Sequence, residues 1–583
     1  MKIKAWKLLA IFFGILAVNT SAQQAQVDPE LLQLLDQNNQ QDVLIILKDQ
    51  VQFKDLPQQW TKAEKGQHVF NALRQHAINT QQPLIDLLQS WNRPSKSYLL
   101  SNAILSAINL EELQQLQTHP LIARIQTDLW YQNELPKDDS FQSDASVRTQ
   151  DTIEWGIEMI KGDEVWDLGY KGAGVIIGGQ DTGVEWYHPA IKAQYKGWNN
   201  GVEDHNYNWH DAIHEINEDN TGNNPCGLNN IAPCDDHNHG THTVGTMVGE
   251  AGFRKIGVAP EASWIGCRNM ERGHGKPSTY LECFEWFLAP TDSNGANPDP
   301  NQAPHVINNS WACPESEGCN PANFSILETA VDNLKAAGVV VVASAGNSGS
   351  QGCSSISTPA AIFENSFTIG ATNEGDQITG FSSRGPVTVD GSDRLKPNVS
   401  APGRNVYSCV RDNAYSTYSG TSMAGPHVAG AVALIISARP ELAGQVALIE
   451  DILEETAIAK TTEENCGGVS GMNIPNNTYG YGRIDVLAAV EAALVIDINQ
   501  TETLDTQNAK VFPNPTDGLL HVNLPVHIQD AYMQLMDTNG RVVHEQRIPS
   551  GSNPLNLTKL SKGMYFYLID SEKNQFSGKL ILQ

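Results

Sequence analysis

The sequence predicts an α/β fold, in which a large domain is built on a parallel sheet flanked by helices. A small α+β module precedes this domain and a small β-sandwich follows it. Within residues 153–495, short apolar runs at 175–178, 306–307 and 339–343 alternate with helical stretches such as 324–337. Runs this apolar are typical of strands that are buried on both faces of a parallel sheet. The pattern changes toward both ends of the chain, which sets the two flanking modules apart.

The first 22 residues predict an export signal. They begin with three lysines, continue with an uninterrupted apolar run from Leu8 to Val18, and end in small residues that suit cleavage after Ala22. This run is too short to span a bilayer, and no later segment has the composition to do so. We therefore expect a secreted protein without stable membrane insertion. The alternative is an uncleaved N-terminal anchor.

Residues 23–130 predict the α+β module, because strand-like and helical runs follow one another in the order β-α-β-α-β. The runs are residues 43–47 (strand), 60–73 and 84–91 (helical), 98–108 (strand), 110–116 (helix) and 121–125 (strand). Residues 131–152 contain Pro136 and a scatter of Asp, Ser and Gln, so they predict a linker.

The charge balance disfavours one broad class of function. The chain has 583 residues, with 38 lysines and arginines against 66 aspartates and glutamates, which gives a net charge of −28. Phosphate contacts need a basic surface, so we expect no nucleic-acid partner.

The nine cysteines all lie between Cys226 and Cys466. Export to an oxidising compartment predicts disulfides for most of them. Cys226 and Cys234, and likewise Cys313 and Cys319, are close enough in sequence to close small loops. Because nine is odd, at least one thiol stays free or pairs between chains. No CxxC…CxxC pattern occurs, so a thiolate zinc site is not expected.

Two further segments have a distinct composition. Residues 190–236 are polar and rich in Asn, Asp and Gly, which predicts a long surface insertion in the large domain. Residues 508–583 alternate apolar and polar residues and contain the hairpin sequence DTNG at 537–540. These features predict a small antiparallel β-sandwich.

Two motifs of the large domain carry side chains suited to acid–base chemistry. Residues 178–184 read GGQDTGV, which places Asp181 between an apolar strand and a glycine turn. This is the sheet edge where ligands bind in open α/β folds. Residues 237–245 read HNHGTHTVG and include His239, and histidine is the natural general base near neutral pH.

A third motif places a serine at the start of an apolar helix. Residues 418–430 read YSGTSMAGPHVAG, so Ser422 follows a glycine turn and opens a helix that runs to about residue 436. The amide groups and dipole at a helix N-terminus stabilise negative charge, including the oxyanion that forms when a serine attacks a carbonyl. Taken alone, Asp181 and Ser422 are also compatible with turn or helix capping.

Together the three motifs resemble the active-site signatures of the subtilisin-like serine proteases (subtilases). Asp181, His239 and Ser422 occur in that family's Asp–His–Ser order, and all three signatures are intact. The resemblance covers roughly residues 153–495. It extends to GVAP at 257–260, VINNS at 306–310, FSSRGP at 381–386, KP at 396–397 and APG at 401–403. It implies that Ser422 attacks the peptide carbonyl, His239 transfers the proton and Asp181 orients His239.

The resemblance also assigns residues around the triad. Asn347, in the motif ASAGNSG, is implied to donate its side-chain amide to the oxyanion. The family's substrate strands are implied to lie along Ser310, Trp311, Ser344, Ala345 and Gly346. Many relatives carry Leu at the position of Trp311 and then two glycines, whereas residues 312–319 differ here. This departure leaves the S1 preference open.

The flanking modules resemble parts of secreted proteases. Residues 23–130 resemble in topology the subtilase inhibitor propeptide, which implies an intramolecular inhibitor removed by cleavage within about 127–152. The alternative is an unrelated interaction domain. Residues 508–583 resemble the sorting domain of the type IX secretion system of Bacteroidetes, through FPNP at 512–515, GMY at 563–565 and GKL at 578–580.

The sorting resemblance implies a secretion machinery as partner and a route through the periplasm to the cell surface or medium. It also implies that the C-terminal module is removed after export. The residues alone indicate only a small β-sandwich that could equally bind carbohydrate.

The resemblance implies no cofactor for catalysis, although subtilases often bind calcium for stability. The polar insertion offers carboxylates without EF-hand spacing, and solvated surface acids are the alternative. These carboxylates are Glu203, Asp204, Asp211, Glu218 and Asp219.

The sequence therefore predicts a secreted serine endopeptidase that acts on proteins and peptides through an acyl-enzyme and is made as a self-processed precursor. One alternative is a binding protein on an inactive protease scaffold, which would not need an intact triad and Asn347. The other is a metallohydrolase that uses His237, His239 and His242, although the HExxH signature is absent.

Overall fold

The computed structural model describes residues 24–496 and 509–582, apart from short gaps. The gaps are residues 55, 134, 136–139, 143–151, 218–219, 221–223, 253, 312–323, 513, 515, 517, 525–527, 529, 538–539, 550–551 and 572–574. The expected signal peptide and the expected Cys313–Cys319 pair lie outside the described residues.

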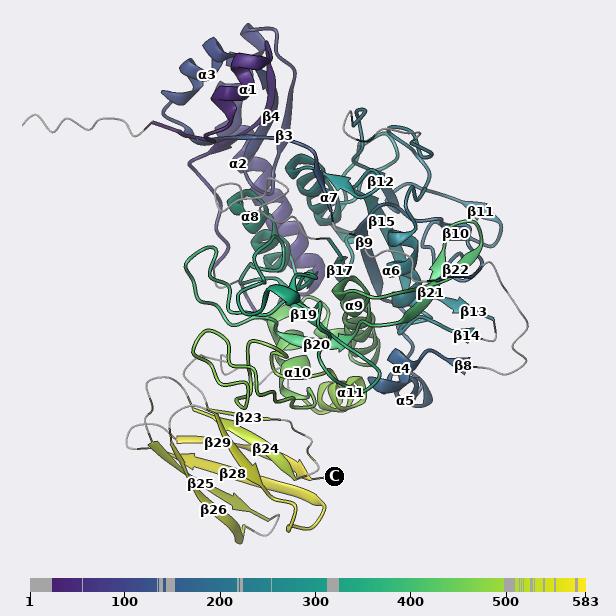
Figure 1. Ribbon diagram of the computed structural model, residues 1–583, viewed down its shortest axis with the longest axis vertical. Helices are drawn as coiled ribbons and strands as arrows, with labels where there is room; N and C mark the ends of the chain where they lie inside the picture. Colours follow the sequence, from purple (N-terminus) through teal and green to yellow (C-terminus); the bar gives the residue numbers. More distant parts are fainter. Residues whose placement is uncertain are drawn as a thin grey trace, which may run out of the picture.

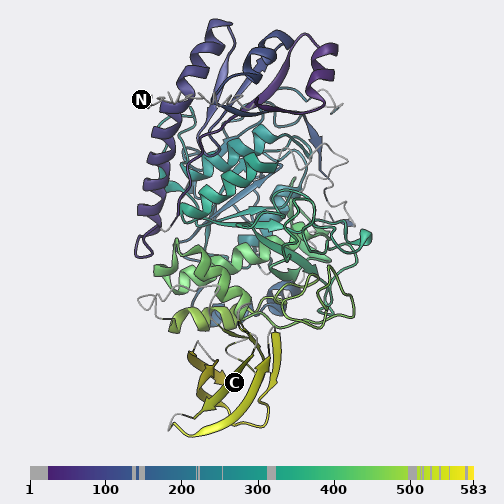
Figure 2. The same cartoon turned by 90° about the vertical axis from the view of Figure 1, so that its left-hand side faces the viewer.

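The described residues form three modules that follow one another along the long axis of the molecule (Figure 1). The N-terminal module, in purple, lies at one end and the C-terminal module, in yellow, at the other, with the central domain between them. The view turned by 90° shows the same order (Figure 2). The modules are therefore stacked in space in the order of the sequence.

The N-terminal module is a five-stranded sheet of order β1-β5-β2-β4-β3, with helices packed on one face. Its strands are β1 (Gln26–Val27), β2 (Gln41–Leu47), β3 (Ser95–Tyr98), β4 (Ala103–Ile108) and β5 (Ile122–Thr127). Its helices are α1 (Leu31–Gln37), α2 (Lys62–Ser90) and α3 (Leu110–Gln117). The predicted α+β character is thus present, with more elements than expected.

Three local expectations for this module are wrong. The two predicted helical pieces are one helix, α2, because Ala77 and Gln81 continue its buried face through the polar stretch, where the Gln81 amide is hydrogen-bonded to Tyr98 and Asn102. The predicted strand at 98–108 is the hairpin β3–β4, since the chain reverses at Asn102, whose φ is +38°. Helix α1, before the first long strand, was not expected.

The other face of the N-terminal sheet packs directly on the central domain. Leu44 and Ile46 of β2 and Phe70 of α2 share one buried apolar cluster with helices α7 (Pro277–Leu288) and α8 (Phe324–Ala336). Burial of apolar surface is the main driving force for such contacts. The two modules therefore share a hydrophobic core.

The central domain is built on a seven-stranded sheet of order β12-β15-β9-β17-β18-β19-β20. Every neighbouring pair in it is parallel, which confirms the predicted α/β fold. The strands are β12 (Trp209–Asp211), β15 (Ser263–Arg268), β9 (Ile176–Asp181), β17 (Val306–Asn309), β18 (Val340–Ser344), β19 (Phe367–Thr372) and β20 (Val399–Pro402).

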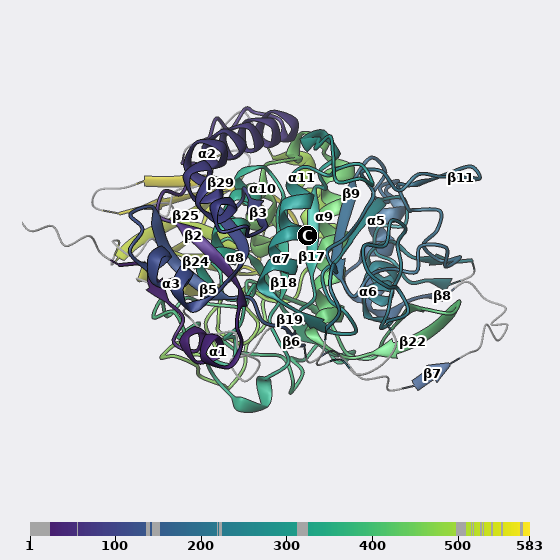
Figure 3. The ribbon, with the colours of Figure 1, turned by 90° about the horizontal axis from the view of Figure 1, so that it is seen from above.

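Helices cover both faces of this sheet (Figure 3). Helices α6 (His239–Val248) and α9 (Thr421–Ala438) pack in one apolar cluster, and α7 and α8 pack in the other. The remaining elements at the edges are α4 (Trp155–Met159), α5 (Gly162–Asp167), α10 (Val446–Glu455), α11 (Val486–Val495), β21 (Val406–Val410) and β22 (Ala414–Tyr418).

Helix α9 lies at the centre of the domain. Its 18 residues are long and apolar enough to cross a membrane by composition alone, so the expectation that no later segment has such a composition is wrong. However, 94% of this stretch is buried inside the protein. It packs against α6, α11 and strands of the sheet. The apolar side chains of α9 therefore form part of the hydrophobic core of the domain.

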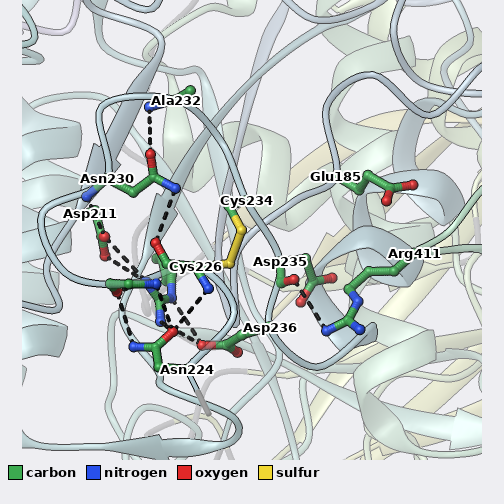
Figure 4. Close-up of a disulfide and its surroundings, with 12 residues drawn as sticks. Glu185, Asp211, Asn224, Cys226, Asn230, Ala232, Cys234, Asp235, Asp236 and Arg411 are labelled. Carbon is green, nitrogen blue, oxygen red and sulfur yellow. Dashed lines mark hydrogen bonds and ion pairs between the residues drawn. A yellow bond between two sulfur atoms is a disulfide. The ribbon is translucent and has the colours of Figure 1, made fainter. Parts of the chain in front are cut away.

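Residues 190–236 are only partly the surface insertion that their composition predicts. They contribute β12 to the central sheet and two buried carboxylates beside a disulfide (Figure 4). Asp211 and Asp236 both accept hydrogen bonds from the fully buried guanidinium of Arg268 on β15, with closest N–O distances of 3.2 and 2.6 Å. The polar composition misled because hydrogen bonds to one shared guanidinium allow these two carboxylates to be buried inside the fold.

The described part of the chain contains three disulfides. The Cys226–Cys234 bond confirms one predicted pair. Two further bonds join residues that are distant in sequence, and Cys409 is free and buried. The bonds are Cys226–Cys234, Cys267–Cys283 and Cys353–Cys466.

The C-terminal module consists of two antiparallel sheets around one apolar core, as predicted for a small β-sandwich. The turn expected at 537–540 joins β25 to β26. One sheet contains β23 (Lys510–Phe512), β24 (Leu519–Asn523) and β27 (Ser552–Asn556). The other contains β26 (Val542–Pro549), β25 (Asp530–Met536), β28 (Gly563–Asp570) and β29 (Gln575–Leu582).

The buried Arg268 cluster should be essential for stability. We expect Arg268→Met to lower the free energy of unfolding by about 3–5 kcal/mol, because it leaves two carboxylates buried without their cation. Arg541, which is 79% exposed, offers a matched control: Arg541→Met should change stability by no more than about 0.5 kcal/mol. Urea denaturation measures both, with Ser422→Ala as a common background that removes the predicted nucleophile. Equal effects of the two substitutions would contradict this account.

Candidate active site

Asp181 is the last residue of β9, which lies inside the parallel sheet. The turn that follows needs glycine at position 183, where φ is +104° and a side chain would collide with the carbonyl oxygen of Cys234. The carboxylate is buried, and its Oδ1 accepts the backbone N–H of Thr182 at 2.7 Å. The strand end and the turn together hold Asp181 in one orientation.

His239 is the first residue of helix α6 and is fully buried. Its Nδ1 lies 2.7 Å from Oδ1 of Asp181. This contact requires α6 to approach the end of β9 closely, and glycine at 240 permits it. A Cβ at that position would lie 2.0 Å from the carbonyl oxygen of Gly183. The ring can donate Nδ1–H to the carboxylate, which leaves Nε2 as the basic atom.

A buried carboxylate that the sequence interpretation did not single out for this role organises the start of α6. Oδ2 of Asp235 accepts hydrogen bonds from the backbone N–H and the hydroxyl of Thr241, at 3.0 and 2.6 Å. Its Oδ1 accepts the hydroxyl of Thr182 at 2.9 Å and the backbone N–H groups of His237 and Asn238. Asp235 therefore ties the Asp181 turn to the helix that carries His239.

Ser422 is the second residue of α9, as the sequence predicts, and it is buried. Its hydroxyl donates to the backbone carbonyl of Ser310 at 3.3 Å, and the Ser310 hydroxyl donates to the Ser422 carbonyl at 3.0 Å. The end of β17 and the start of α9 are thus held together by a reciprocal pair of hydrogen bonds.

The Nε2 atom of His239 is buried and has no hydrogen-bond partner among the described residues. A buried polar atom without a partner is costly, so each one calls for an explanation. The Ser422 hydroxyl is bonded to the Ser310 carbonyl, so His239 Nε2 remains available as an acceptor. Catalytic hydrogen bonds commonly tighten only once substrate is bound.

The amide of Asn347 has a defined orientation. Its Oδ1 accepts the backbone N–H of Thr421 at 2.9 Å and the Thr421 hydroxyl at 3.1 Å. Because a backbone N–H can only donate, the atom facing it is the amide oxygen. The Nδ2 group of Asn347 is therefore left to donate elsewhere, beside the N-terminus of the helix that carries Ser422.

The residues expected to line the substrate strands lie around the start of α9. Ser344 donates its hydroxyl to the Thr421 carbonyl at 2.9 Å, and the Gly346 N–H donates to the Thr421 hydroxyl at 3.2 Å. Ala345 is buried and donates its N–H to β19. Trp311 is buried and stacks on Tyr280, with ring centroids 4.0 Å apart.

Two of the three histidines proposed for a metallohydrolase, His239 and His242, bond to other groups of the protein. His242 donates Nε2–H to the Val406 carbonyl at 3.1 Å and stacks on Tyr418. Burial lowers the pKa of His242 to about 3, so its ring is neutral. The group of possible metal ligands that the described residues do bring together, His210, His214 and Glu282, lies on other elements.

The acids expected to offer calcium ligands do not form one site in the described part of the chain. Asp211 is buried against Arg268, and its oxygens also accept the backbone N–H groups of Ile213 and Asn230. Glu203 is exposed. Residues 218–219 lie outside the described residues. Asp211 therefore stabilises the fold as part of an ion pair.

The comparison with known proteins agrees with this geometry. Residues 172–482 match the model of the subtilase family, and residues 510–583 match that of the secretion system C-terminal sorting domain. The chain is 34% identical to Bacillopeptidase F of Bacillus subtilis over 450 residues, 74% of this chain and 29% of that protein. It therefore spans less than a third of that relative.

Two shorter relatives are matched over most of their length. The chain is 32% identical to Subtilisin DY of Bacillus licheniformis over 342 residues, 58% of this chain and 99% of that protein. It is 31% identical to the major intracellular serine protease of Bacillus subtilis over 291 residues, 49% of this chain and 76% of that protein. The chain belongs to the subtilase family of serine endopeptidases and carries a C-terminal sorting domain of the type IX secretion system.

Proposed function

We propose that this protein is a secreted endopeptidase in which Asp181, His239 and Ser422 form the catalytic triad. The observation that carries the proposal is the buried Asp181–His239 hydrogen bond, which leaves His239 Nε2 unpartnered in the fold that presents Ser422. His239 differs from the other buried histidines because its second ring nitrogen is bonded to a buried carboxylate, which would stabilise the imidazolium form. A binding protein on an inactive scaffold would have no use for a buried basic atom.

The reaction follows from these positions. Ser422 Oγ attacks the peptide carbonyl while His239 Nε2 takes the hydroxyl proton, and Asp181 stabilises the imidazolium. His239 then gives the proton to the leaving amine, and the C–N bond breaks to leave an acyl-enzyme. Water, deprotonated by His239, hydrolyses the ester and restores the Ser422 hydroxyl. No cofactor enters these steps.

The oxyanion would be held by the Ser422 backbone N–H and by Asn347 Nδ2. Two hydrogen bonds from Thr421 to the amide oxygen support this assignment, because they fix which end of the amide is free. We assign the substrate strands to the segments around Ser310 and Trp311 and from Ser344 to Gly346, which border the same helix N-terminus.

The N-terminal module would be an inhibitory propeptide. Both oxygens of Asp128 bind Ser278 in the first turn of α7, where the carboxylate accepts the N–H at 2.9 Å and the hydroxyl at 2.6 Å. Such a carboxylate is favoured at a helix N-terminus. In return, Glu285 of α7 accepts the backbone N–H groups of Leu99 and Leu100. These reciprocal contacts supplement the shared apolar core.

The chain leaves this module as a strand laid beside the central domain. Strand β6 (Tyr131–Gln132) pairs antiparallel with β16 (His274–Gly275), and the Asn133 N–H donates to the Gly273 carbonyl at 2.7 Å. Strand β7 (Ser140–Gln142) then pairs with β22, which leads into the Ser422 segment. We propose that the processing cleavage falls after Asn133 and before β8 (Thr152–Ile153).

Export would run through the periplasm and across the outer membrane under the direction of the C-terminal module. We propose that this module engages the secretion machinery as a folded β-sandwich and is then removed.

Loss of Ser422 should abolish both hydrolysis and self-processing. We expect residues 23–583 to hydrolyse casein and to shorten on incubation, and Ser422→Ala to do neither. Asp181→Asn should lower kcat by about 10⁴, the scale known for this triad. Ser419→Ala is the matched control, because that hydroxyl accepts a surface N–H from Asn405. Equal residual hydrolysis in wild type and Ser422→Ala would overturn the triad and favour a metal mechanism.

Thr421 should act on the reaction through Asn347. Thr421→Val removes the hydroxyl that donates to the amide oxygen, so we expect kcat to fall about tenfold or more with KM nearly unchanged. Thr421→Ser should restore most of kcat. Asn347→Ala should cost about 10²–10³ in kcat, the scale known for a subtilisin oxyanion donor. Steady-state kinetics on a short peptide distinguishes these effects. A change confined to KM would argue against positioning of the oxyanion donor.

Asp128 should control how long the N-terminal module inhibits the enzyme. Asp128→Asn weakens the charged contact with the start of α7, so the lag before casein hydrolysis should shorten severalfold. Asp86→Asn on the exposed face of α2 is the matched control and should leave the lag unchanged. The lag is the time before casein hydrolysis begins, and it is measured on the full chain. A gel of the same sample shows when the chain shortens. An unchanged lag in Asp128→Asn would contradict the inhibitory role.

A further inference from the structure

A buried carboxylate at the interface of the first two modules collects three basic side chains. Oε1 of Glu282, on α7, lies 2.8 Å from Nε2 of His210 and 2.8 Å from Nε2 of His214. Its Oε2 forms an ion pair with Lys96 of the N-terminal module. The carboxylate is 10% exposed, so it has little water to solvate it. The triad uses none of these groups.

The three groups of the central domain form a set of metal ligands. One ligand atom from each of His210, His214 and Glu282 lies within 4.8 Å of the other two. Two imidazoles and one carboxylate are a ligand set that zinc prefers, with a water in the fourth position. Ligand atoms of one tetrahedral zinc lie about 3.4 Å apart, given Zn–N distances of about 2.1 Å. A bound zinc would therefore lengthen the two 2.8 Å contacts of Glu282 Oε1 by about 0.6 Å and bring any wider pair of ligand atoms closer together.

Neighbouring residues orient the two histidine ligands. His210 lies on β12, which is paired with β15, and its ring stacks on Trp286 with an interplanar angle of 15°. The Nδ1 of His214 lies 2.5 Å from Oδ1 of Asn229, to which it can donate, and Nε2 faces Oε1 of Glu282, so Nε2 would give up its proton when a metal binds. A histidine that donates Nδ1–H to an oxygen presents Nε2 to a metal, which is the usual arrangement around zinc ligands.

The ammonium group of Lys96 is the cation that lies beside Glu282 and His214 in this structure. Its Nζ pairs with Oε2 of Glu282 and lies 3.5 Å from Nε2 of His214. Two cavities of about 280 and 850 Å³ lie on either side, and Lys96, His214 and Glu282 line both of them. Solvent-sized space therefore reaches the cluster even while the N-terminal module is in place.

We propose that His210, His214 and Glu282 form a zinc-binding site that Lys96 fills in the precursor and vacates when the N-terminal module is removed. The vacating step rests on the proposed processing, whereas the ligand set itself does not. Zinc would replace the ammonium as the counter-charge of Glu282. It would also tie the segment that carries His210 and His214 to α7 in the processed protein.

The test uses the full chain in a form that cannot process itself. The Ser422→Ala precursor should bind no zinc at the site, because Lys96 remains in place. Ser422→Ala with Lys96→Ala should bind one zinc ion per chain, measured with zinc chloride against a chromophoric chelator. Cobalt chloride should give the visible absorption of four-coordinate cobalt in the same variant. Lys96→Arg keeps the positive charge and is the matched control that should exclude both ions.

A fourth variant identifies the ligands. Adding His214→Gln to the Ser422→Ala, Lys96→Ala protein should weaken zinc binding at least tenfold and remove the cobalt spectrum. Thermal unfolding verifies that each variant is folded. A folded Lys96→Ala variant that binds no zinc, or equal binding with and without His214, would overturn the proposed site.

The dependence on processing is tested separately. Processed wild type, freed of the N-terminal module and inhibited at Ser422, should bind zinc as tightly as the Lys96→Ala precursor. If processing does not occur, the proposed self-processing is wrong. Zinc binding by the Lys96→Ala precursor still shows whether the three ligands form a metal site. If the processed protein forms but binds no zinc, the proposal that release opens the site is wrong.

Discussion

The hydrogen bond between Asp181 and His239 is the constraint on which the rest of the central domain depends. It joins the end of a buried parallel strand to the first residue of a buried helix, two elements that meet only if their backbones nearly touch. The glycines at 183 and 240 make that approach possible, and Asp235 satisfies the polar groups that the approach would otherwise leave unpaired. Helix α6 is then fixed against the sheet, and α9 packs against α6.

The motifs around the proposed triad could be predicted because each is local in sequence. Asp181, His239 and Ser422 each lie next to the glycine or the helix start that positions them. A short segment of sequence therefore shows both the reactive side chain and the backbone feature that places it. The central sheet was predictable for a similar reason, since strands buried on both faces are apolar throughout. Asn347 was placed through the resemblance, and the role of Thr421 in orienting it emerges only from the contact.

Apart from the local errors in the N-terminal module, the features that were missed join residues that are separated in the chain. The Arg268 cluster spans residues 211–268, and its acids look like surface acids until the arginine on β15 is brought to them. The Cys353–Cys466 bond closes a separation of 113 residues. No pattern within one segment indicates such pairs, because burial of a polar side chain is decided by its partner and not by its neighbours in sequence.

If the N-terminal module is removed as proposed, helix α7 would serve two states of the same protein. Glu282 and Glu285 lie three residues apart and both face the N-terminal module. The two N–H groups that bond to Glu285 belong to that module, whereas Glu282 has partners in both modules. Glu285 is satisfied by backbone N–H groups of the module, so its charge meets water again when the module leaves. Glu282 keeps two histidines of its own domain and loses only the lysine. Departure of the module therefore removes a cation from a site that remains built to hold one.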